Sequence, residues 1–199
     1  MPHRSVARGL AAMFFLGLAT LSWDATAQPP SASEAVFDAT GRAGNASRPV
    51  RFRFMCTPNG GPGINGVLSV ALEIPRPAQW RGGFDFEPFE GPDATAGALS
   101  HLQANGVRTK ASNRFAAAGS TPDTGANAAF VFEIAASRRD PAGLGRVAAV
   151  LRPLMDGPGQ LVWRQGNAKR EGAPIAASLE LLAERAERLK AVLSPCLAR

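Results

Sequence analysis

Alternation of apolar and polar side chains predicts several short strands. In residues 50–56, Val, Phe and Cys alternate with Arg and Met, and residues 68–74 repeat this period of two. Such a period is typical of strands with one buried face. The segment 57–66 between them contains two Asn-Gly pairs and further glycines, which favours a hairpin connection. Further strands are predicted at 84–87, 107–112, 130–134 and 161–163.

Two internal segments carry helix signals. Asp93 is a suitable N-cap for a helix that Gly106 would stop. Asp140-Pro141 joins a capping residue to the proline favoured in a first helical turn, and apolar residues keep helical spacing up to Leu151. Pro153 either follows the end of this helix or kinks its last turn. The polar stretches 112–127 and 165–171 are expected to be loops.

The C-terminal segment has the clearest helical periodicity. Its apolar residues advance by three or four positions at a time through Leu179, Leu182, Ala186, Leu189, Leu193 and Cys196. This spacing predicts one amphipathic helix, which Pro195 should end near Ser194.

The two cysteines, Cys56 and Cys196, both fall on predicted buried faces. We expect them to form a disulfide that closes a loop of about 140 residues and stabilises the fold by at most ~5 kcal/mol. The bond would hold the C-terminal helix against the sheet. The sequence therefore predicts an α+β fold, with a mostly antiparallel sheet of six or seven short strands and two or three helices.

The N-terminal 27 residues have the three parts of a bacterial Sec-type signal peptide. A basic start precedes an apolar run at 9–23 and the sequence Ala-Thr-Ala at 25–27, which fits the small-x-small cleavage rule. The alternative, an uncleaved anchor, is disfavoured because the run is shorter than the ~20 residues of a spanning helix. We expect residues 28–34 to be a disordered lead-in and residues 35–199 to form one domain. The mature protein is predicted to be periplasmic or secreted, with no transmembrane anchor.

Charge offers one candidate binding face. The formal net charge of +6 is only a weak argument for an anionic partner, and no nucleic acid or cofactor is expected. Four basic residues share the outward side of their predicted strands: Arg51, Arg53, Arg108 and Lys110. If the strands were adjacent, these side chains would form one face able to meet lipopolysaccharide, an acidic protein or a nucleotide. The alternative is ordinary solvated charge on an exposed sheet.

A second candidate is an acidic and aromatic segment that comprises Asp85, Phe86, Glu87, Glu90 and Asp93. Aromatic rings beside carboxylates suit a sugar, whereas carboxylates alternating with Phe are also the ordinary wet face of a strand. The Asp-x-Asp-x-Asp-Gly pattern of calcium loops is absent, and no metal site is predicted.

His101 is the only histidine outside the signal peptide, so the mature chain cannot build a two-histidine site. It could orient a serine nucleophile, but the sequence has no Gly-x-Ser-x-Gly elbow. Its neighbours Leu99 and Leu102 suggest an ordinary amphipathic helix. A structural or surface role is therefore favoured over a catalytic one.

These features favour a non-enzymatic binding module for an envelope protein or an anionic envelope ligand. Two alternatives stay open. One is a periplasmic hydrolase that uses His101 or the carboxylates from Asp85 to Asp93, and it requires a pocket that contains those residues. The other is a structural envelope component, which would show a flat surface with an exposed apolar patch.

Overall fold

The computed structural model describes residues 33–58, 66–80, 83–90, 98–121, 128–168 and 172–197. In chain order these residues form β1 (Ser33–Ala43), β2 (Ala46–Thr57), β3 (Val67–Pro75), η1 (Pro77–Trp80), η2 (Glu87–Phe89), β4 (Ser100–Gly106), β5 (Lys110–Phe115), β6 (Ala118–Ser120), β7 (Ala129–Ser137), α1 (Pro141–Met155), β8 (Gly159–Gln165), β9 (Ile175–Leu181) and α2 (Ala183–Leu197). Neither α1 nor α2, nor either short helix in these ranges, is long and apolar enough to cross a membrane.

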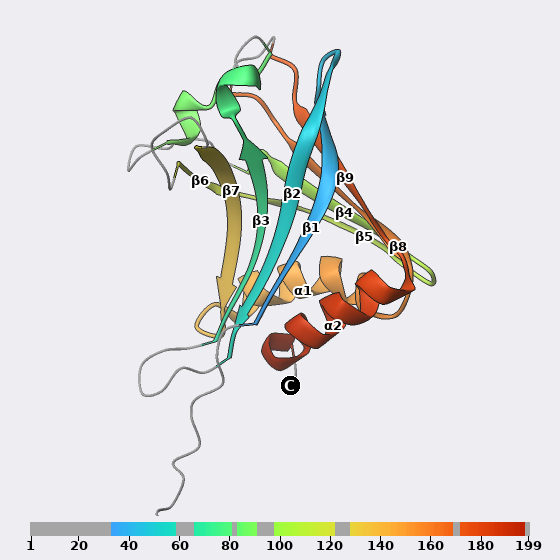
Figure 1. The fold of residues 1–199 in the computed structure, drawn as a ribbon. Helices are drawn as coiled ribbons and strands as arrows, with labels where there is room; N and C mark the ends of the chain where they lie inside the picture. The colour runs from blue at the N-terminus through green and yellow to red at the C-terminus, as the bar shows by residue number, and fades with distance from the viewer. Residues whose placement is uncertain are drawn as a thin grey trace, which may run out of the picture.

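The strands build one antiparallel sheet that curls into a half-barrel (Figure 1). The strand order is β5-β4-β8-β9-β1-β2-β3-β7-β6, so β5 and β6 are the two edges. The helices α1 and α2 cover one end of the hollow side of the sheet, and the short helices η1 and η2 lie at the opposite end (Figure 1). One face of the sheet is therefore turned toward helices and core, and the other forms the convex outside.

The predicted α+β fold with six or seven strands is wrong, because the described residues form nine strands and are mostly sheet. Three strands, β1, β6 and β9, carry weak sequence signals. Their inward positions are partly occupied by Ala and Gly, as at Ala35, Gly41 and Ala177. Small residues bury little apolar area. Where they occupy the inward positions, the alternation of apolar and polar residues that predicts a strand is weak.

Residues 100–106 form β4 rather than the predicted helix. This segment pairs with β5 on one side and β8 on the other, and it buries Ser100, Leu102 and Ala104 with a period of two. The two ladders satisfy its backbone groups on both sides, so the tertiary context overrides the helical pattern. Asp93, the predicted N-cap, lies outside the described residues.

The predicted disulfide and the packing of the C-terminal helix on the sheet are confirmed. Cys56 and Cys196 are bonded with their Cα atoms 5.8 Å apart, and α2 contacts β1 and β2. Its start was misplaced, since Leu179 and Leu181 belong to β9, and Leu182 between β9 and α2 is exposed. The helix also continues past Ser194 to Leu197, with Pro195 inside its last turn.

The start of α1 is as predicted. The Asp140 side chain accepts a hydrogen bond from the Gly143 N–H at 2.9 Å, and Pro141 opens the helix. The helix continues through Pro153 to Met155. The end of α1 lies very close to β4 at Gly106. A Cβ at this glycine would be only 2.3 Å from the Pro153 carbonyl oxygen. Glycine is therefore required at this crossing of helix and sheet.

Candidate functional site

Arg51 and Arg53 lie on the convex side of β2, but their charges are already paired. Both guanidinium groups contact the carboxylate of Glu73 on β3, Arg53 at 3.1 Å. Arg53 also bridges to Glu34 on β1 at 3.1 Å. Glu73 is 5% exposed and is the one buried carboxylate among the described residues. An anionic ligand would have to compete with these carboxylates for the two arginines.

Arg108 and Lys110 lie at the β4–β5 hairpin, far from Arg51 and Arg53. Four strands, β4, β8, β9 and β1, stand between β5 and β2 in the sheet. The condition under which the four basic residues would form one face, namely that their strands be adjacent, is therefore not met. Arg108 and Lys110 are exposed at one end of the molecule and do not join Arg51 and Arg53 in one face.

The aromatic residues of the acidic segment belong to the core. Phe84, Phe86 and Phe89 are at most 6% exposed and pack against Phe130 and Phe132 on the inner side of β7. They close this end of the half-barrel instead of offering a platform for a sugar.

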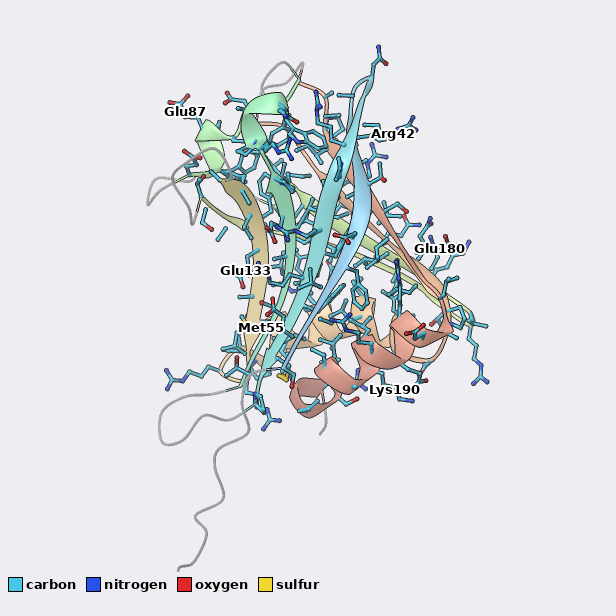
Figure 2. The ribbon with its side chains drawn as sticks, viewed as in Figure 1. Arg42, Met55, Glu87, Glu133, Glu180 and Lys190 are labelled. Carbon is cyan, nitrogen blue, oxygen red and sulfur yellow. A yellow bond between two sulfur atoms is a disulfide. The ribbon has the colours of Figure 1, made fainter. Side chains whose placement is uncertain are left out.

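The carboxylates of the same segment do not converge. Asp85 accepts a hydrogen bond from the Glu87 backbone N–H at 3.3 Å, and Glu90 accepts one from Thr121 at 3.0 Å. Glu87 points out at the edge of the molecule (Figure 2). Asp93 lies outside the described residues. Within those residues, no group of three or more His, Cys, Asp or Glu side chains could hold a metal ion.

His101 projects from the convex side of β4 and lies between two arginines. In the strand register it is opposite Arg114 on β5 and Arg164 on β8. Among the described residues, no hydrogen bond joins its imidazole to a carboxylate, as a serine–histidine–aspartate arrangement would require.

The register continues this line across the sheet. Arg164 is opposite Ala176 on β9, and Ala176 is opposite Arg42 on β1. Four basic side chains thus form one line across five strands, which we call the convex basic row: Arg42, Arg164, His101 and Arg114. Because neighbouring strands are about 4.8 Å apart, successive arginines of the row are separated by about 10 Å.

No carboxylate in the described part of the chain neutralises the positive charge of the row. Its three arginines are exposed, and none forms an ion pair there. Along the strands, Glu180 lies four residues from Ala176, and Asp38 lies four residues from Arg42. At about 3.4 Å per residue that is roughly 13 Å, beyond the ~8 Å screening length of physiological salt. Figure 2 shows Arg42 near the upper end of the sheet and Glu180 well below it.

Hydrogen-bonding side chains lie beside the row. The next line of convex residues contains Ser112, Gln103, Val162, Ser178 and Thr40. The surface therefore combines spaced positive charges with uncharged donors and acceptors, the composition that suits a phosphorylated or carboxylated polar ligand.

Sequence patterns could not identify this row. Arg42 lies on a strand that was not predicted, Arg114 falls in a predicted loop, and His101 falls in a predicted helix. Only strand order and register bring these residues together.

A second feature lies at the end of the half-barrel that carries η1. A hollow of about 290 Å³ is lined by the β1–β2 turn, Gln79, Trp80 and Gly83. Trp80 is 2% exposed, and its indole N–H has no hydrogen-bond partner. The Nε of Arg48 is also buried and unpartnered, while its Nη1 donates to Gln79 at 3.3 Å. Both unpaired donors are shielded from solvent, so we assign no ligand to this hollow.

Comparison with known proteins adds no functional assignment. No protein-family model, curated protein or solved structure matches this chain.

Proposed function

We propose that this protein is a non-enzymatic binding protein of the bacterial envelope, and that its convex basic row binds an extended anionic ligand. The observation that carries the proposal is the line of three exposed arginines at intervals of about 10 Å, none of which forms an ion pair with another described residue. An extracytoplasmic location is supported by the Cys56–Cys196 disulfide, since such bonds persist in oxidising compartments, and by the signal-like N-terminal sequence.

The curvature of the sheet favours a flexible, chain-like ligand over a planar membrane surface as the partner of the row. The row runs across the strands, which is the direction in which a half-barrel curves. A planar bilayer would touch only part of such an arc. A chain that carries phosphate or carboxylate groups can follow it and contact each guanidinium, where planar N–H donors form paired hydrogen bonds with either group.

The test measures binding of purified lipopolysaccharide and of its dephosphorylated form. The variant Arg42→Gln/Arg114→Gln/Arg164→Gln removes the charge of the row. The matched control, Arg108→Gln/Lys110→Gln/Arg146→Gln, removes the same number of exposed charges elsewhere. We expect the row variant to lose at least tenfold in affinity, the control to change by less than about twofold, and dephosphorylation to weaken binding to the wild type.

Equal losses in the two variants would show that net charge alone attracts the probe, and would refute a site at the row. Absence of binding to the wild-type protein would refute this ligand class. Thermal unfolding of each variant checks that the fold is intact, because all six substituted residues are exposed.

A further inference from the structure

A groove of about 300 Å³ lies between α1 and the end of α2, on the opposite side of the sheet from the convex basic row. The lining is mainly apolar, and two arginines border it. Its residues are Arg138, Pro141, Leu144, Gly145, Ala148, Arg152, Cys196 and Leu197. This volume is at the small end of the range for ligand pockets, which fits a short apolar chain.

The two arginines converge on the last turn of α2, although Arg138 precedes α1 and Arg152 lies in the last turn of α1. Arg138 donates from Nη2 to the Pro195 carbonyl oxygen at 3.4 Å, and Arg152 donates from Nη2 to the Leu197 carbonyl oxygen at 3.1 Å. Each hydrogen bond uses one donor of a guanidinium that has five. The side chains are thus oriented at the groove, and most of their donors form no hydrogen bond with the described residues.

In the described part of the chain, no carboxylate pairs with the positive charge of these two arginines. Among the described residues, neither Arg138 nor Arg152 forms an ion pair. The carbonyl ends of a helix carry only a partial negative charge, equivalent to about half an electron charge, so α2 offsets little of the two full charges. The groove therefore joins an apolar floor to a rim with excess positive charge.

We propose that this groove binds a free medium-chain fatty carboxylate, with its alkyl chain against Leu144, Ala148 and Leu197 and its carboxylate between Arg138 and Arg152. Charge complementarity selects an anionic head group, and the apolar lining selects the alkyl chain. The site is separate from the convex basic row and does not depend on the function proposed there.

Gly145 allows the groove to be filled without disturbing the helix. Apart from the adjacent residues and the backbone of its own helix, a Cβ at this position would meet no described atom within 4 Å, and the residue is exposed on α1. The substitution Gly145→Leu should place its side chain in the groove. It should also favour the helix, because glycine is a poor helix former.

The experiment is calorimetric titration of the intact oxidised protein with octanoate, and with octanol as the neutral probe of equal chain length. We expect saturable one-to-one binding of octanoate by the wild type. Gly145→Leu should weaken it at least tenfold. Arg138→Gln/Arg152→Gln should weaken octanoate at least tenfold and change octanol by less than about twofold. The convex-row variant should bind octanoate as the wild type does.

Lack of saturable octanoate binding by the wild type would overturn the proposal, as would unchanged affinity in Gly145→Leu. An equal loss for octanoate and octanol in the arginine variant would overturn the assignment of the carboxylate to this pair. Far-UV circular dichroism and thermal unfolding establish that each variant is folded, and the arginine variant tests the site independently of Gly145→Leu.

Discussion

Cys56 at the end of β2 and Cys196 in the last turn of α2 are joined by a disulfide across 140 residues of sequence. Cys56 lies on the inner side of the sheet and is fully buried, and Cys196 also lines the groove between the two helices. The bond therefore fixes one wall of that groove to the sheet.

The disulfide should make a large contribution to stability. Disulfides typically stabilise the native state by about 2–4 kcal/mol because they restrict the unfolded chain, and the loop-entropy estimate of ~5 kcal/mol for this loop is the upper limit. We expect Cys56→Ser/Cys196→Ser to lose that amount in denaturant unfolding, compared with the oxidised protein. The reduced wild-type protein is the control and should behave as the double variant does. Equal stability of all three forms would contradict this prediction.

Two glycines should respond in opposite ways to alanine. Gly145→Ala should stabilise the protein by about 1 kcal/mol, because the new methyl group meets open space and alanine favours helix. Gly106→Ala should destabilise it by roughly 2 kcal/mol or more, because its Cβ would lie 2.3 Å from the Pro153 carbonyl oxygen and force α1 away from β4. Thermal unfolding of both variants decides. Unchanged stability of Gly106→Ala would contradict the close approach of α1 to β4.

The buried carboxylate of Glu73 should matter more than the exposed carboxylate of Glu34. Glu73→Gln keeps the shape but removes the charge that faces Arg51 and Arg53, and we expect a loss of about 1–2 kcal/mol. Glu34→Gln is the matched control. Its carboxylate bridges only Arg53 and its side chain is 47% exposed, so the change should stay within about 0.5 kcal/mol. Urea unfolding measures the stability of the two variants. Equal losses of stability would be evidence against a special role for the buried ion pairs of Glu73.

The N-cap of α1 should also be measurable. Asp140→Ala removes the acceptor of the Gly143 N–H and should cost about 1 kcal/mol. Asp156 at the other end of α1 is the control, because a negative charge near a helix C-terminus is not stabilising. Asp156→Ala should therefore leave the midpoint of denaturant unfolding unchanged or raise it slightly. A larger loss for Asp156→Ala than for Asp140→Ala would contradict this assignment.

Local signals were reliable where a segment is strongly patterned. The large apolar residues of β2 and β3 alternate with polar or small ones, and both strands and their pairing are found where expected. The N-cap at Asp140 and the pairing of the two cysteines are likewise confirmed. These features depend on contacts within a few residues, or on there being only two cysteines to join.

Local sequence patterns gave the wrong secondary structure where pairing with neighbouring strands determines it. The stripe that starts at Leu179 fits helical spacing, yet β8 pairs with residues 179–181 and makes them the end of strand β9. His101 likewise lies in a strand because β5 and β8 pair with it on both sides. The sequence of a short segment does not reveal this strand pairing, since the hydrogen-bond partners come from distant parts of the chain.

The sequence by itself determined the central hairpin, the capped start of α1, the amphipathic end of α2 and its disulfide, because local spacing and cysteine chemistry specify them. Only the tertiary structure decided which charges stand together. It paired Arg51 and Arg53 with Glu73, separated them from Arg108 and Lys110, and aligned Arg42, Arg164, His101 and Arg114. The physical reason is that strand order and register, which place residues far apart in sequence about 5 Å from one another, arise from packing of the whole sheet.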